Sequence, residues 1–78
     1  MSPEQKKAAA RDLLNNPVVL LLLREMEQDA MDQIISADPK DDTTRAAFAG
    51  EVRAIRNFRD NLNLCIEEGN VSGTRAPA

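Results

Sequence analysis

The chain has 78 residues, 42% of them hydrophobic, and a formal net charge of −3. This length corresponds to one small domain, and the modest negative charge argues against a nucleic-acid binder that works by bulk electrostatics. With no histidine and a single cysteine, the chain lacks the usual nitrogen and sulfur ligands of zinc and cannot form an internal disulfide.

The first predicted helix spans about residues 3–14. Ser2 can cap it, Pro3 suits its first position, and Gln5 can complete a capping box. The segment is short and weakly amphipathic, so it would be only marginally stable on its own. We expect it to place Leu13 and Leu14 against the apolar residues that follow.

The second predicted helix spans about residues 17–37, with Asn16 as its cap and Pro17 at its first position. It opens with six consecutive apolar residues, 18–23, which are too few to cross a bilayer. The run is also apolar all round, unlike a half-exposed helix turn. We therefore expect this chain or another chain to cover it on more than one side.

A short turn around Pro39 ends the second helix, and Asp41 or Asp42 is expected to cap a third helix over about residues 43–68. The short connection predicts that the two long helices are antiparallel neighbours. The third helix carries an apolar stripe made of Phe48, Val52, Ile55, Leu62 and Ile66. Gly69 suits a C-terminal cap, and residues 70–78 are small, polar and unpatterned.

Together these elements predict an all-α fold: a long antiparallel helical hairpin with a short N-terminal helix packed at its open end. Residues 1–69 would form a single helical domain, followed by a flexible tail over residues 70–78. The polar N-terminus does not resemble a signal peptide, and the lone cysteine fits a reducing compartment. A soluble intracellular protein is therefore expected.

The residues of the chain do not favour catalysis, a cofactor or a metal. There is no histidine, tyrosine or Gly-rich phosphate loop, and Cys65 lies on or beside an apolar stripe. Glu25, Asp29 and Asp32 share a helix face that could hold a hard cation, but the ordered loop spacing of a calcium site is missing. We interpret this face as solvated or paired with arginines, and expect no enzyme activity.

Four arginines lie along one side of the third helix and form a candidate charged docking stripe: Arg45, Arg53, Arg56 and Arg59. One interpretation is that they form salt bridges to the acidic face of the second helix. The other is that they dock onto an acidic partner or a phosphate backbone, since the arginine fork suits both. The absence of interleaved aromatic residues disfavours nucleic acid.

Association with another protein is the leading structural hypothesis. A helix that is apolar all round for almost two turns exceeds what one neighbouring helix can cover. The candidate protein interface is therefore made of Val19, Leu20, Leu22 and Leu23. The alternative is a tight three-helix monomer, in which Leu13 and Leu14 close over the run.

Five features of the sequence occur together: the Asn16-Pro17 helix start, the acidic, Ala-rich helix through Glu25 and Asp32, the Asp38-Pro39-Lys40-Asp41 turn with Arg45 after it, the segment 52–62, and Glu67-Glu68-Gly69. In these features the chain resembles a group of short helical-hairpin proteins encoded by tailed phages and prophages. The resemblance covers residues 13–69. It implies a virion or packaging component, or an accessory protein acting on host factors, and carries over no catalytic residue.

The first functional hypothesis is a non-enzymatic structural or assembly protein of a tailed phage, which oligomerises or docks on a larger virion component. Its expected location is the cytoplasm of the host cell, with incorporation into a virion, and no membrane. One alternative is a small adaptor or inhibitor that binds a host or viral protein. A further alternative is a DNA-packaging or regulatory factor that uses the arginine stripe on phosphates.

Overall fold

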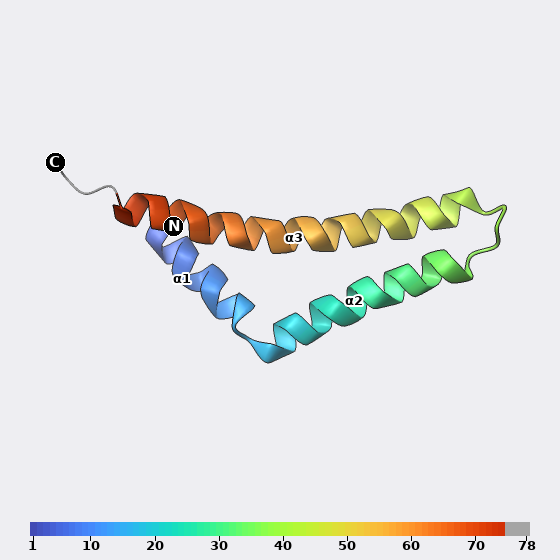
Figure 1. Ribbon diagram of the computed structural model, residues 1–78, viewed down its shortest axis with the longest axis horizontal. Helices are drawn as coiled ribbons and strands as arrows, with labels where there is room; N and C mark the ends of the chain where they lie inside the picture. The colour runs from blue at the N-terminus through green and yellow to red at the C-terminus, as the bar shows by residue number, and fades with distance from the viewer. Residues whose placement is uncertain (75–78) are drawn as a thin grey trace.

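A computed structural model describes residues 1–74 of the chain and contains three α-helices and no strand in that range. They are α1 (Pro3–Leu14), α2 (Pro17–Ser36) and α3 (Asp42–Thr74). Helix α3 runs the length of the molecule, and both α1 and α2 pack against it (Figure 1). The prediction of an all-α fold is confirmed.

The helix starts follow the predicted capping chemistry. The Ser2 hydroxyl accepts from the Gln5 amide N–H at 3.1 Å, and the Ser2 N–H donates to the Gln5 side chain at 2.9 Å, which completes the capping box. The Asn16 side chain accepts from the Val18 N–H at 3.0 Å. Each cap satisfies backbone donors that have no partner within the helix itself.

Asp41 is one of the two residues that were predicted to cap the third helix, and it does cap α3. Its carboxylate accepts from the Thr44 amide N–H at 3.0 Å and from the Thr44 hydroxyl at 2.6 Å. These hydrogen bonds lower the pKa of Asp41 below its ordinary value of 3.8, and the nearby Arg45 charge acts in the same direction. The carboxylate therefore stays ionised and fixes the point at which the chain re-enters a helix.

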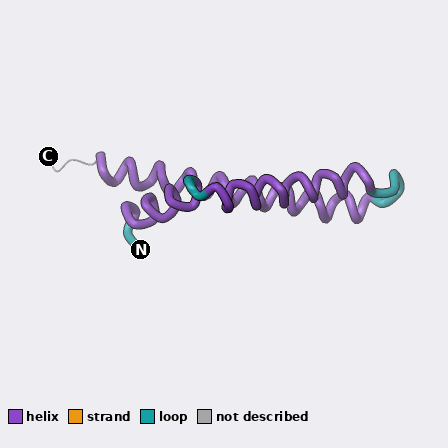
Figure 2. The backbone as a smooth tube through the Cα atoms, turned by 90° about the horizontal axis from the view of Figure 1, so that it is seen from below, coloured by secondary structure: helices purple, strands orange, loops and turns teal. Residues whose placement is uncertain are grey.

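Helices α2 and α3 form a single layer with a thin core. The Cα extents of the molecule are 61 × 24 × 16 Å, and the smallest of these exceeds the roughly 4.6 Å that the Cα atoms of one straight helix would span. Seen from below, α2 lies over α3 while α1 turns to one side (Figure 2). The core consists of six buried apolar residues: Ala10, Leu23, Ala30, Val52, Ile55 and Leu62. Within residues 1–74, no second layer covers either flank of the α2–α3 pair.

The molecule is correspondingly extended and exposed. Its Cα radius of gyration is 17.1 Å, whereas a compact domain of this length would have about 11–12 Å. Its accessible surface is 5900 Å², and size scaling for a compact monomer of this mass gives about 4,700 Å². The chain therefore exposes about 1,200 Å² more than a compact monomer of its mass would.

Helix α3 does not end at Gly69, so the prediction of a C-terminal cap there is wrong. The helix continues through Gly69 to Thr74, which places the first part of the predicted tail in a helix. Gly69 is buried because Lys7 of α1 packs directly onto it. A glycine here permits close approach of two helices, not a change of backbone direction. Residues 75–78 of the predicted tail lie outside the described residues.

Helix α1 packs differently from the expectation that Leu13 and Leu14 would cover residues 18–23. It packs far more extensively against α3 than against α2, and Lys6 lies 4.0 Å from a carboxylate oxygen of Glu68. Leu13 remains exposed and Leu14 is half-buried. The small residues Ala10 and Gly69 explain this preference, since both are buried and allow the backbones of α1 and α3 to approach closely.

Replacement of Gly69 with alanine is expected to detach α1 from α3. A Cβ added at Gly69 would fall 2.7 Å from Lys7 Cδ and closer still to Lys7 Cβ, which cannot move without its helix. We expect Gly69→Ala to lower the free energy of unfolding by about 1–3 kcal/mol, the usual cost of overpacking, in urea titrations followed by circular dichroism.

Gly50→Ala is the matched control for that experiment. It is also a helical glycine of α3, but a Cβ at this position meets nothing within 4 Å. Alanine should therefore stabilise the helix there by about 0.5–1 kcal/mol. Equal gains at Gly50 and Gly69 would contradict a close α1–α3 contact.

Candidate protein-interaction surface

The apolar residues 18–23 open α2, and only part of this run is covered by the rest of the chain. At about 100° per residue, six residues go all round the helix. Leu23 is 9% exposed and belongs to the core, and Val19 is half-buried. Val18, Leu21 and Leu22 remain 60%, 50% and 50% exposed, and Leu20 is exposed as well. The single layer of helices leaves the rest of the run uncovered.

The structure thus divides the four residues predicted as a protein interface. Leu20 and Leu22 are exposed, whereas Val19 and Leu23 are turned toward the rest of the chain. Sequence reasoning did not select Val18 and Leu21, which are among the most exposed apolar residues of α2. The sequence did contain a sign that these two residues are exposed. Their spacing from Leu23 and Ala30, which are buried, places Val18 and Leu21 on other faces of the helix.

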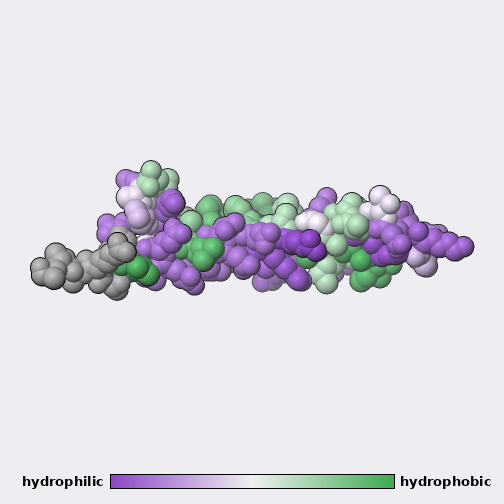
Figure 3. Space-filling view, turned by 90° about the horizontal axis from the view of Figure 1, so that it is seen from above, coloured by the Kyte–Doolittle hydropathy of each residue, from purple (hydrophilic) through white to green (hydrophobic). Residues whose placement is uncertain are grey.

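Further apolar side chains are exposed along both long helices. They are Met26, Met31 and Ile35 of α2, and Phe58, Leu64 and Val71 of α3. Seen from above, the outward ridge of α3 is mostly hydrophilic, and hydrophobic side chains come into view along both of its edges (Figure 3). Exposed apolar groups therefore flank the α2–α3 pair instead of covering its outer ridge.

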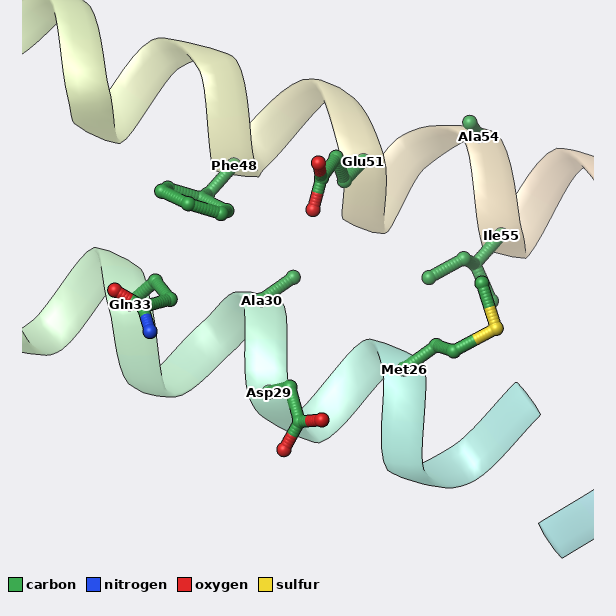
Figure 4. Close-up of a pocket in the computed structure, with 8 residues that line it drawn as sticks. All are labelled: Met26, Asp29, Ala30, Gln33, Phe48, Glu51, Ala54 and Ile55. Carbon is green, nitrogen blue, oxygen red and sulfur yellow. The ribbon is translucent and has the colours of Figure 1, made fainter. Parts of the chain in front are cut away.

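A groove of about 510 Å³ lies on one flank, between α2 and α3. We call it the acidic groove, because its apolar floor is accompanied by Asp29 and Glu51 and by no cation. The floor is formed by Met26, Ala30, Phe48, Ala54 and Ile55. Met26 reaches toward Ile55, and the Glu51 side chain points across from α3 toward α2 (Figure 4). Neither carboxylate forms an ion pair among the described residues.

A second groove of about 510 Å³ is lined by the opposite flanks of the same two helices. We call it the basic groove, because Arg53 and Arg56 line it, together with one carboxylate, Asp60. Its apolar part is made of Met31, Ile34, Ala49 and Val52. Glu51 and Arg53 are two residues apart, which places them about 160° apart around α3. The two grooves therefore lie on opposite sides of the layer.

The four arginines predicted as one stripe have three different roles. Arg45 holds the α2–α3 turn: its guanidinium donates to the carbonyl oxygens of Asp38 and Pro39, both at 2.7 Å, and pairs with Asp42. Arg56 and Arg59 pair with Glu27 of α2 at 2.7 and 3.6 Å. Arg53 is exposed and has no ion pair among the described residues. A continuous docking stripe is therefore not formed.

Glu27 is the acidic residue that joins α2 to α3. Its side chain is only 18% exposed and lies between two guanidinium groups. The hydrogen bond from Arg56 lowers the pKa of Glu27 below its ordinary value of 4.5, and the charges of Arg56 and Arg59 add to this shift. The expected pairing of arginines with the second helix thus occurs, but through Glu27 and not through the acidic face.

The acidic face of α2, predicted from Glu25, Asp29 and Asp32, has no arginine partner among the described residues. Asp32 accepts a hydrogen bond from the Gln28 side chain at 2.9 Å, along the same helix. Within residues 1–74, no three side chains of the His, Cys, Asp or Glu type gather into a group that could hold a metal ion. This face therefore adds unpaired negative charge to the flank of the acidic groove.

Cys65 is a free, half-buried thiol. The Ser2 hydroxyl is occupied as a helix cap. Within the described part of the chain, no helix combines the length and hydropathy that a membrane span requires. The most developed surface features are thus the two grooves and the exposed apolar residues of α2.

Comparisons of this chain with known proteins found no relative. No family model matches the chain, and no match was found among curated proteins or solved structures.

The Glu27 ion pairs predict a pH-dependent stability. The pKa of Glu27 is lower in the folded chain, so its contribution is fully present above the ordinary value and is lost as the pH falls through the lowered value. We expect Glu27→Gln to have a lower Tm than the wild type at neutral pH, and the difference to disappear in acid.

Glu25→Gln is the control, because Glu25 is exposed and has no ion pair among the described residues. Its Tm should follow that of the wild type at every pH. A deficit of Glu27→Gln that stays constant from neutral to acid pH would instead point to a loss of packing.

Arg45→Ala is expected to loosen the α2–α3 turn. The substitution removes hydrogen bonds from a charged donor to the carbonyl oxygens of Asp38 and Pro39. We expect a loss of about 1–2 kcal/mol in the free energy of unfolding, measured by urea titration. Lys40→Ala, in the same turn, should change it by no more than about 0.5 kcal/mol, and an equal loss in both variants would argue against the Arg45 contacts.

Proposed function

We propose that this protein is a non-enzymatic assembly protein that acts by burying the exposed apolar surface of α2 against other copies of itself. The observation that carries this proposal is the exposure of Val18, Leu21 and Leu22 on a chain with an otherwise thin core. Apolar side chains grouped in this way on a small protein mark interaction surfaces.

The framework for this role is an antiparallel hairpin of α2 and α3. Three pairs of neighbours support it: Gln33 shares a groove with Phe48, Met26 shares it with Ile55, and Glu27 pairs with Arg56. The residue numbers decrease on α2 as they increase on α3, which is the register of antiparallel helices. Such a hairpin presents two long edges to its partners.

The setting proposed for this assembly is the particle of a tailed phage, as the resemblance of residues 13–69 implies. The protein would be made in the cytoplasm of the host cell and joined to itself or to a larger virion component. Capture of one host or viral protein by the same apolar surface is the second candidate, since residues 18–23 would also suit a groove-binding helix.

The arginines favour protein association over phosphate binding. Arg56 and Arg59 are engaged by Glu27, and Arg45 is engaged by the turn. Among the described residues, Arg53 is the one arginine of the four without an ion pair, and Asp60 lies in the same groove. A phosphate backbone needs several free cations in a row to bind strongly.

Light scattering behind a sizing column, over a concentration series, tests the proposal. The wild type should form a multimer, and Leu22→Glu should shift it to the monomer because a buried charge without a partner is costly. Leu64→Glu is the matched control: Leu64 is 49% exposed and Leu22 is 50% exposed, but Leu64 lies on α3, outside the apolar run 18–23.

Leu64→Glu should therefore leave the multimer intact. A wild type that stays monomeric at every concentration would overturn the self-assembly proposal. Capture of a single partner from host or infected lysate would then favour the adaptor hypothesis.

A further inference from the structure

We infer that copies of this chain associate through opposite faces, with the acidic groove of one copy seated against the basic groove of the next. This inference rests on the proposed function, because it specifies how the self-association would be built. It concerns the pairing of two different surfaces, which is a heterologous contact and leaves one free groove at each end of any open assembly.

Both grooves offer apolar area for such a contact. Leu22 and Met26 are four residues apart, and Leu20 and Met31 are eleven apart, so each pair shares a side of α2. Met26 lines the acidic groove and Met31 lines the basic groove. All four are exposed. The apolar surface of residues 18–23 therefore continues into both grooves, one on each flank.

Charge decides which grooves can pair. The acidic groove contains Asp29 and Glu51 without a cation, and Glu25 is close to the same flank of α2. The basic groove contains Arg53 and Arg56; Arg56 is paired with Glu27, Asp60 lies in the same groove, and Arg53 supplies the remaining positive charge. Two acidic grooves brought together would oppose carboxylates without a counter-charge, whereas unlike grooves place carboxylates against guanidinium groups. Complementary potentials of this kind fix which surfaces meet.

The charged side chains of the two grooves also lie at similar positions along the axis of α3. Glu51 and Arg53 are two residues apart on α3, which corresponds to about 3 Å along the helix axis. When one copy is stacked on another without a large shift along the layer, Arg53 of one copy comes close to Glu51 of the next. Arg53 is free for this contact, since it forms no ion pair among the described residues.

The exposed area is sufficient for a second copy. The chain exposes about 1,200 Å² more than a compact monomer of its mass would, and a partner in a standard interface buries about 800 Å². Stacked copies would cover each other's flanks and supply the second layer that α2 and α3 lack within residues 1–74.

Two one-sided variants test the inference. Ala54→Trp adds bulk to the acidic groove, and Arg53→Trp adds the same side chain to the basic groove from the neighbouring position of α3. Both positions are exposed, so the helices should keep their circular dichroism spectrum and Tm. Each variant alone should self-associate about tenfold or more weakly than the wild type, as expected when one well-packed contact is lost.

An equimolar mixture of the two variants is the decisive sample. The intact acidic groove of Arg53→Trp can bind the intact basic groove of Ala54→Trp, and the resulting pair has no intact groove left with which to grow. We expect light scattering to find twice the mass of one chain and nothing larger. A multimer unchanged by both variants, or weakened by only one of them, would overturn the inference and indicate a different or symmetric interface.

A charge-exchange series tests the electrostatic part. Glu51→Lys and Arg53→Glu should each weaken self-association about tenfold or more, because each places like charges in contact. The double variant Glu51→Lys with Arg53→Glu should restore it. A double variant that self-associates as weakly as the weaker single variant would overturn the pairing of these two groups.

The results also separate this inference from the proposed function. A monomeric wild type would overturn both. A wild type that forms a multimer, together with a contrary result from the tryptophan variants or from the charge-exchange series, would overturn the inference alone.

Discussion

The structure depends on α3 as the one helix against which both other helices pack. Because α1 and α2 occupy successive parts of α3, they lie beside the same helix without covering each other. The pair of α2 and α3 is therefore a layer one helix thick, in which each apolar stripe is buried on one side only. A core of six small or medium apolar residues is all that such a layer can enclose. Burial of more apolar surface requires a second layer, and this chain has no further helix to form one within residues 1–74.

The way in which α1 and α2 pack on α3 explains why the apolar residues at the start of α2 are exposed. In a compact three-helix bundle, α1 and α3 would cover α2 from two sides and residues 18–23 would form the core. Here α1 is held on α3 by the contact of Lys7 with Gly69, at a distance that only glycine permits. Helix α1 is thereby kept from closing over α2, and Val18, Leu21 and Leu22 remain exposed. One small residue in α3 thus influences how much of the apolar surface of α2 stays exposed.

The charged side chains of α2 and α3 fall into two groups, one between the helices and one on the flanks. The ion pairs that join α2 to α3 use Glu27 with Arg56 and Arg59, close to the contact between the helices. The charges that line the two grooves differ, with Asp29 and Glu51 on one flank and Arg53 together with Asp60 on the other. A single layer with unlike flanks can stack in one sense only, which is a simple physical basis for ordered self-assembly.

The sequence by itself determined the all-α class, the three helices and their starts, because caps, prolines and hydrophobic spacing act within a few residues. It also predicted that residues 18–23 exceed what one neighbouring helix can bury. Tertiary structure decided the rest, since contacts between distant residues have no local signature. Gly69 continues the spacing of Leu62 and Ile66, yet only the approach of Lys7 makes it an interior helical residue. The arginines share one side of α3 in sequence, but the positions of Glu27 and of the turn carbonyls distribute them among three roles. Which leucines are covered, and which flanks carry which charge, follow from how α1 and α2 are placed on α3.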